Sequence, residues 1–156
     1  MPGGESAVVT RRSIGKPWQP ITNFQDFTEQ LVKGVHNFDA AGHVFRIYLS
    51  NTTPSASLDA VKADLAEIAG GNGYTAGGED VQNTVSETGG TATVAGTDVV
   101  WTASGGAIAQ FRYVVLYNDT SASDNLVAWW DHGSPLTLAS SETFTVDFGT
   151  SIFTLT

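Results

Sequence analysis

The chain has 156 residues, with 7 Lys and Arg against 16 Asp and Glu, which gives a formal net charge of −9 at pH 7. This length fits a single domain that can bury a sizeable hydrophobic core. The absence of cysteine excludes a disulfide framework, a thiolate metal site and a cysteine nucleophile. The acidic balance argues against a nucleic-acid partner, because binding phosphates needs clustered Lys and Arg.

Small and β-branched polar residues dominate the rest of the composition, with 19 Thr, 13 Ser and 17 Gly. Threonine packs well on a pleated sheet and glycine suits tight turns, so this composition favours a mainly β protein. The first residues lack the apolar segment of a signal peptide, and no apolar run is long enough to cross a membrane. We therefore expect a protein made in a cytoplasm, without a membrane partner.

The first twenty residues differ in composition from the remainder of the chain. They contain three prolines and three of the basic residues, Arg11, Arg12 and Lys16. This pattern predicts an extended N-terminal arm over residues 1–20, followed by one domain over residues 21–156. A solvated, disordered leader is the alternative.

Two short helices are predicted next. Asn23 is a suitable N-cap for a helix from about Phe24 to Lys33, which Gly34 would end. The second predicted helix begins at the cap residue Ser57 and ends at Gly70. Its apolar residues recur at helical spacing, at Leu58, Val61, Leu65 and Ile68.

Strands are predicted from alternating apolar residues. The stretch Val44–Ser50 alternates, and Phe111–Tyr117 is apolar on both faces, which predicts a central position in its sheet. Together with two short helices and the arm, these runs predict an antiparallel β-sandwich of jelly-roll-like type. The other predicted strands are Val81–Val85, Thr91–Val94, Asp98–Ala103, Leu126–Trp130, Leu136–Leu138, Thr143–Phe148 and Ile152–Leu155.

No local motif nominates a catalytic residue, a cofactor site or a metal site. Asp131 and His132 are adjacent, but neighbours on a strand point to opposite faces, so this carboxylate is badly placed to orient the imidazole. The loop Asp119–Asn125 has the acidic and amide groups of a weak calcium site, although such loops are more often polar hairpin connections. We therefore predict a protein that is not an enzyme.

The tryptophans suggest a contact surface. Trp101 lies in an apolar strand and is expected in the core, whereas Trp129 and Trp130 are neighbours that must project to opposite faces. One of this pair leaves the core of its own sheet. It meets a second buried layer, another subunit or a sugar ring.

Basic residues are absent after Arg112. Exposed edge strands are usually protected by Lys, Pro or bulges, and Pro135 is the only such residue in this part of the sequence. The unprotected edges predict that a partner chain or the arm covers them, and hence a homo-oligomer.

Four segments together resemble a family of small phage and prophage virion proteins. They are VFRIYLSNTTP at 44–54, AEIAGGNGYTAGG at 66–78, VWTASGGAIAQFRYVVLY at 100–117 and LVAWWDHGSPLTL at 126–138. The resemblance spans about Thr22 to the C-terminus. It implies a structural component of a bacteriophage virion with a β-sandwich body and no catalytic residues.

Within that family the expected role is capsid decoration. A cement protein of this kind binds the major capsid protein on the outer surface of the head and stabilises the shell, and we expect it to do so as a homotrimer. In the arm, Arg11, Arg12 and Lys16 would pair with carboxylates of the capsid, and Trp18 would fill an apolar notch.

Two other roles remain open at this point. In the first, the protein is a tail or fibre component in which Trp129 or Trp130 stacks on a host-surface carbohydrate. The second, a hydrolase of cell-wall glycans, is weaker because no acid pair is nominated by the sequence.

Overall fold

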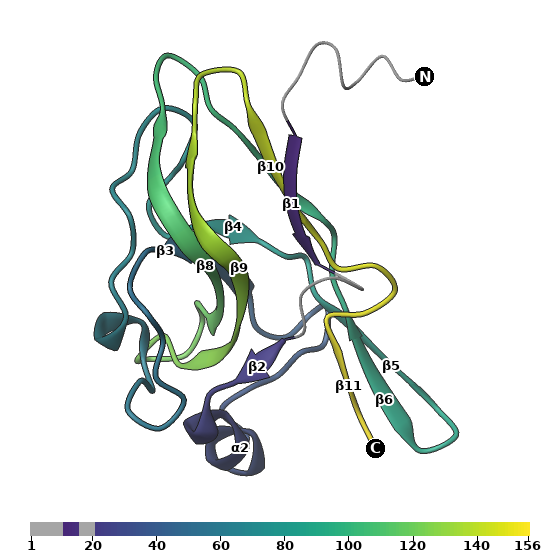
Figure 1. Cartoon of the computed structure of the whole chain (residues 1–156). Helices are drawn as coiled ribbons and strands as arrows, with labels where there is room; N and C mark the ends of the chain where they lie inside the picture. Colours follow the sequence, from purple (N-terminus) through teal and green to yellow (C-terminus); the bar gives the residue numbers. More distant parts are fainter. Residues whose placement is uncertain (1–10, 16–20) are drawn as a thin grey trace.

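The computed structural model describes residues 11–15 and 21–156, and in this part the chain is mainly β, as predicted (Figure 1). The described residues form one α-helix, α2 (Gln25–Val32), and one 3-10 turn, η1 (Lys62–Asp64). The strands are β1 (Arg11–Gly15), β2 (Thr22–Asn23), β3 (Phe45–Ser50), β4 (Glu79–Asp80), β5 (Thr84–Thr88), β6 (Thr91–Ala95), β7 (Val99–Thr102), β8 (Ile108–Asn118), β9 (Leu126–Leu138), β10 (Thr143–Asp147) and β11 (Phe153–Leu155).

The described strands form three sheets. The largest has five antiparallel strands in the order β2-β9-β8-β3-β4. A second sheet has the order β1-β10-β7, with β1 parallel and β7 antiparallel to β10. The third, β11-β6-β5, is antiparallel throughout and ends in the long β5–β6 hairpin visible in Figure 1.

Strand β8 lies at the centre of the five-stranded sheet, as its two apolar faces predict. Val114 and Leu116 point into the main core, whereas Tyr113 and Val115 point to the opposite face. Phe111 also enters the main core, because the pairing of β8 with β9 shifts register between Phe111 and Tyr113. A bulge therefore moves this ring to the face that strict alternation does not predict.

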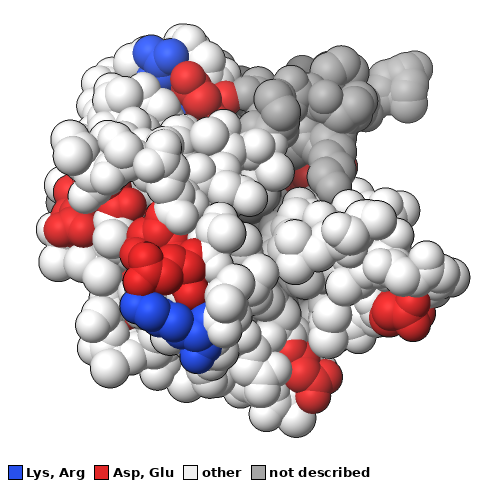
Figure 2. All heavy atoms as spheres, turned by 90° about the horizontal axis from the view of Figure 1, so that it is seen from below, with Lys and Arg blue, Asp and Glu red and all other residues white. Residues whose placement is uncertain are grey.

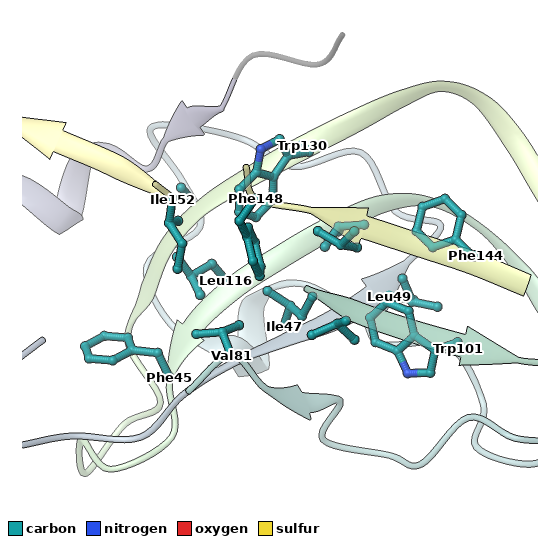
Figure 3. Packing of buried hydrophobic residues seen from close by; sticks show 14 of the residues in the cluster. Phe45, Ile47, Leu49, Val81, Trp101, Leu116, Trp130, Phe144, Phe148 and Ile152 are labelled. Atoms are coloured by element: carbon teal, nitrogen blue, oxygen red, sulfur yellow. The ribbon is translucent and has the colours of Figure 1, made fainter. Parts of the chain in front are cut away.

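The main core lies between the five-stranded sheet and the β1-β10-β7 sheet. Figure 3 shows Ile47 and Leu49 of β3 opposite Trp101 of β7 and Phe144 of β10. Each of these four side chains is at most 1% exposed. Packing of two apolar faces is the main source of stability for such an arrangement.

A second, smaller cluster covers the outer face of the five-stranded sheet. Tyr48, Tyr117 and Leu126 of the sheet pack there against Leu65 from the connection between β3 and β4. The sheet is therefore buried on both faces along β3 and β8.

The predicted second helix is wrong. The segment after Ser57 forms only η1 and otherwise crosses the outer face of the sheet, with Leu65 buried but Leu58 80% exposed. Its backbone pairs with other segments: Lys62 N donates to Asp124 O, and Ile68 N donates to Leu49 O. These long-range bonds replace helical ones, so the local helical periodicity loses to tertiary pairing.

Helix α2 matches its prediction within one residue at each end, but its capping differs. Phe24, not Asn23, occupies the N-cap position, and no side chain caps the helix there. Asn23 instead belongs to β2, which pairs with β9. Gly34, with φ of +77°, follows the C-terminal end of the helix, as expected for a residue in the left-handed region.

Part of the predicted arm belongs to a sheet. Residues 11–15 form β1, in which Arg11 pairs with Thr143 and Arg12 with Phe144 of β10. The predicted arm residues Lys16 and Trp18 lie outside the described residues.

Candidate functional site

The two adjacent tryptophans project to opposite faces of β9. Trp130 is 2% exposed and packs in the main core, with its ring centroid 5.8 Å from that of Phe148. Trp129 is half-buried on the other face, and its centroid lies 4.7 Å from that of Phe24. The side chain that leaves the main core therefore meets a second layer within the same chain. Of the two rings, Trp129 alone retains surface for a ligand.

Asp131 and His132 do not act as a pair. Asp131 accepts two hydrogen bonds from Arg112, at 2.8 Å from Nε and 3.0 Å from Nη2. This guanidinium holds the pKa of the Asp131 carboxyl below its usual range. His132 Nδ1 lies 3.0 Å from the carbonyl oxygen of Ser134. The arrangement gives His132 no orienting carboxylate.

The loop after β8 uses its polar groups for structure. Asp119 Oδ2 accepts a hydrogen bond from Arg46 Nε at 3.0 Å, and its other carboxylate oxygen lies 3.3 Å from Tyr117 Oη. The backbone N–H groups of Thr120 and Ser121 donate to Asn118 Oδ1. Among the described residues, no group of three His, Cys, Asp or Glu side chains is placed to hold a metal ion. The calcium site considered for this loop therefore has no supporting cluster.

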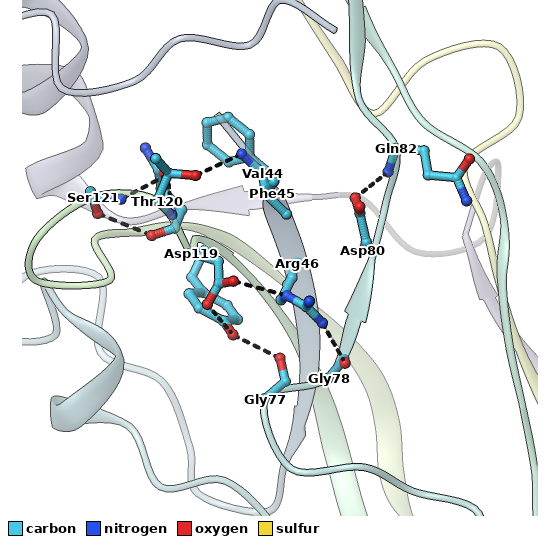
Figure 4. Close-up of polar contacts among 12 residues, drawn as sticks. Val44, Phe45, Arg46, Gly77, Gly78, Asp80, Gln82, Asp119, Thr120 and Ser121 are labelled. Carbon is cyan, nitrogen blue, oxygen red and sulfur yellow. Dashed lines mark hydrogen bonds and ion pairs between the residues drawn. The ribbon is translucent and has the colours of Figure 1, made fainter. Parts of the chain in front are cut away.

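Arg46 joins three segments, as Figure 4 shows. Besides its ion pair with Asp119, it donates from Nη1 to the carbonyl oxygen of Gly78 at 3.2 Å. Tyr117 donates to the neighbouring carbonyl oxygen, that of Gly77, at 2.7 Å. The connection before β4 is thereby fixed against β3 and β8.

Glu67 lies within the connection between β3 and β4 and holds its parts together. Its Oε1 accepts from Tyr74 Oη and from Gly77 N, both at 2.6 Å, and its Oε2 accepts from Lys62 Nζ at 2.7 Å. The Lys62 ammonium also lies 4.9 Å from the ring centroid of Tyr48. Burial, and then the nearby Glu67, raise the pKa of the Tyr74 hydroxyl, which stays protonated as a donor. All of these groups have partners, which is typical of a structural network.

A groove of about 530 Å³ lies between the edges of β2 and β11 and is lined by residues 21–23 and 152–155. Its lining residues are aliphatic, aromatic, hydroxyl and amide side chains. The groove therefore offers apolar contacts and hydrogen bonds but no acid or base for catalysis.

Strand β5 lies at the edge of its sheet and is exposed along its whole length. All five of its side chains are exposed, and Val85 is 42% exposed. Its five pairs with β6 continue without a register shift, so no bulge interrupts the strand. The strand contains no Lys, Arg or Pro, and Glu87 is its one charged residue.

Other free edges are shorter or more polar. The five-stranded sheet ends in β2 and β4, which have two residues each, and β4 consists of Glu79 and Asp80. The outer edge of β7 is longer and carries Val100, which is 55% exposed, although the backbone of Gly73 lies against the Thr102 end of this strand. The edges of β5 and β7 are therefore the candidate contact surfaces. Figure 2 shows one face on which acidic side chains gather in separate clusters with few basic ones.

Sequence reasoning placed the unprotected edges after Arg112, whereas β5 and β7 both precede this residue, and of the described strands after it only β11 ends a sheet. It placed a strand at Val81–Val85, whereas β5 begins at Thr84. The β5–β6 hairpin could have been predicted from the sequence TVSETGGTATVA at 84–95, which has two alternating runs on either side of Gly89-Gly90.

Comparisons with protein-family models, with curated proteins and with solved structures found no match in any of the three. Among the described residues, no helix is long and apolar enough to cross a membrane.

Proposed function

We propose that the protein is a non-enzymatic structural component of a bacteriophage virion, a capsid decoration protein that works as a homo-oligomer. The free edge of β5 carries this proposal. Its backbone offers unpaired N–H and C=O groups that another strand satisfies, and it lacks the protection of a monomer's edge strand. The sequence resemblance supplies the virion setting.

The body suits that task as a β-sandwich of jelly-roll-like type, antiparallel except for the pairing of β1 with β10. The five-stranded sheet and the β1-β10-β7 sheet share one core, and hydrogen bonds of Arg46 and Glu67 fix the segment before β4. A body of this kind presents strand edges in fixed positions, as binding to a regular shell requires.

A trimer requires head-to-tail contacts, in which one edge meets a different edge of the next copy. The two candidate edges supply such a pair, since β5 carries the exposed Val85 and β7 the exposed Val100. We propose that β5 of one copy adds to β7 of the next. The arm residues Arg11, Arg12, Lys16 and Trp18 would then remain to contact the major capsid protein.

The oligomer is tested with Val85→Lys and Val100→Lys. Each change places a charge on an edge that the trimer buries, so both variants are expected to be monomers. Val32→Lys, at a helix position that is 85% exposed, is the matched control and is expected to keep the trimer. Light scattering after size exclusion gives the masses.

Two outcomes contradict this arrangement. A monomeric wild-type protein at micromolar concentration overturns the oligomer. A dimer that only Val85→Lys dissociates replaces the ring with a twofold pairing of β5 edges.

The virion role is tested by counting copies in purified particles that carry the protein. A decoration protein is expected at a number comparable with that of the capsid subunits, and particles lacking it should lose their contents at a lower temperature. A few copies per particle, together with blocked adsorption by the free protein, would instead indicate a tail component that binds a receptor.

A further inference from the structure

Two histidines meet one asparagine beneath the loop that joins α2 to β3. Asn118, at the end of β8, is completely buried. Its Nδ2 lies 3.1 Å from His36 Nδ1 and 3.0 Å from His43 Nδ1, and it donates to the carbonyl oxygen of Val35 at 3.1 Å. These contacts fasten residues 34–44, here called the 34–44 loop, to the five-stranded sheet.

The orientation of the Asn118 amide bears on the protonation state of the His36 imidazole. Its Oδ1 accepts the backbone N–H groups of Thr120 and Ser121, so the Nδ2 side must face the histidines. Nδ2 is only a donor, and its two hydrogens serve three neighbours: the Val35 carbonyl and the two Nδ1 atoms. An Nδ1–H of His36 would point at this donor from 3.1 Å, so His36 is neutral, with its proton on Nε2, when the cluster is intact.

The surroundings of His36 cannot accommodate a charge. The side chain is 7% exposed, and its ring centroid lies 5.3 Å from that of Phe27 and 5.8 Å from that of Phe45. Its Nε2 is buried and has no hydrogen-bond partner among the described residues. Protonation would place a donor on Nδ1 against the N–H group of Asn118 and leave a buried imidazolium without an acceptor.

The titratable groups around His36 are few. His43 lies in the same loop, and Asp26 lies on α2. The packed strands contribute Phe45 from β3 and Asn118 from β8, neither of which titrates. Burial, and secondarily His43, lower the pKa of His36 from 6.5 to about 4, and the weaker influence of Asp26 opposes them.

We propose that His36, His43 and Asn118 form an acid-sensitive latch, in which protonation of His36 releases the 34–44 loop from the end of β8. The aromatic rings beneath this loop would then become accessible. Phe38 of the loop stacks on Phe45 with centroids 4.1 Å apart and meets Phe153 of β11 at 5.2 Å. Opening at the latch therefore exposes an apolar surface next to β11.

The sign of the effect follows from the direction of the shift. The closed form of His36 binds a proton less readily than the open form, so closure is favoured at neutral pH and weakens as pH falls. Between the ordinary value of 6.5 and the lowered value of about 4, the opening constant should rise about tenfold for each pH unit.

Hydrogen exchange by mass spectrometry tests the latch on the full chain. Peptides covering 34–44, corrected for the intrinsic pH dependence of exchange, should lose protection by about tenfold per pH unit below about pH 6, while the centre of β8 stays protected. His36→Phe puts an uncharged ring among Phe27, Phe38 and Phe45, and should abolish most of this loss. His132→Phe, on β9 outside the cluster, is the matched control and should behave as wild type.

A measurement on the wild-type protein covers the case in which His36→Phe does not fold. Ring ¹⁵N chemical shifts should show the Nε2–H tautomer for His36 at neutral pH, and protonation of His36 in step with the loss of exchange protection. An Nδ1–H tautomer at neutral pH, or protonation of His36 without loss of protection, overturns the latch. An equal loss of exchange protection in His36→Phe and in the wild-type protein also overturns the latch.

Discussion

Replacing Gly78 with alanine is expected to lower the free energy of unfolding by more than about 3 kcal/mol. Gly78 has a φ of +76°, and a Cβ at this position would overlap the carbonyl oxygen of Ile47 on β3. A backbone atom in a paired strand cannot move aside as a flexible side chain does. The strain of a left-handed alanine adds about 1 kcal/mol.

The overlap at Gly78 also breaks hydrogen bonds. The Gly78 carbonyl accepts from Arg46, and the next residue, Glu79, pairs with Ile47. Moving the backbone away from β3 therefore weakens both the hydrogen bond from Arg46 and the pairing of β4 with β3.

Gly77→Ala is the matched control for this prediction. Gly77 has a φ of +96°, but the nearest atom to its Cβ would be Tyr117 Oη at 3.8 Å. Only backbone strain remains, so a loss of about 1 kcal/mol is expected. Guanidinium denaturation followed by tryptophan fluorescence measures both variants, and equal losses would show that the approach of Gly78 to β3 has little energetic weight.

Alternation along the chain was sufficient to predict most strands. In the predicted strand Thr143–Phe148, the residues Phe144, Val146 and Phe148 fall at every second position, and all three are at most 2% exposed. This works because a side chain on a strand has only two directions, so an apolar residue at every second position marks the core face. The secondary-structure prediction was wrong where hydrogen bonds to side chains, or to backbone groups distant in the sequence, fix a different conformation.

The predicted helix after Ser57 shows such a failure. Asp64 Oδ2 accepts from the N–H groups of Ala60 and Val61, which lowers the pKa of this carboxyl. The carbonyl of Ala60 in turn accepts from Leu126 N on β9. The local pattern contains no information about this strand, which lies more than 60 residues away in the sequence.

The length of strand β9 was underestimated. The sequence around Gly133 and Pro135 resembled a turn between two strands, yet β9 continues through it to Leu138. Between the pairs Tyr113–Asp131 and Phe111–Leu136 the two strands advance unequally. A bulge accommodates proline and glycine within one bent strand.

The buried polar clusters could not be predicted from the sequence. His36 and Asn118, or Glu67 and Tyr74 with Leu49 N, come together only after the sheets form. Single buried polar residues resemble ordinary loop residues in a sequence, because nothing local indicates their burial or their partners. The assignment of Trp101 to the core, by contrast, needed only its apolar strand.

Trp101→Ala is expected to lower the free energy of unfolding by about 4 kcal/mol. Trp101 is 1% exposed and lies between Tyr74 and Phe144, with ring centroids 5.9 Å and 6.3 Å away. Its removal leaves a cavity between the five-stranded sheet and the β1-β10-β7 sheet, which the paired strands β7 and β10 cannot close without losing their register.

Trp101→Phe separates the ring's packing from its polar group. The Trp101 Nε1–H is buried and has no partner among the described residues, so its burial already costs free energy in the wild-type protein. Phenylalanine keeps most of the aromatic contact and removes this donor, so the two effects oppose each other and a net loss below about 1.5 kcal/mol is expected. Urea denaturation of both variants gives the comparison. If Trp101→Phe were as costly as Trp101→Ala, the indole N–H would have to be a satisfied donor, and the energetic contribution assigned to ring packing alone would be wrong.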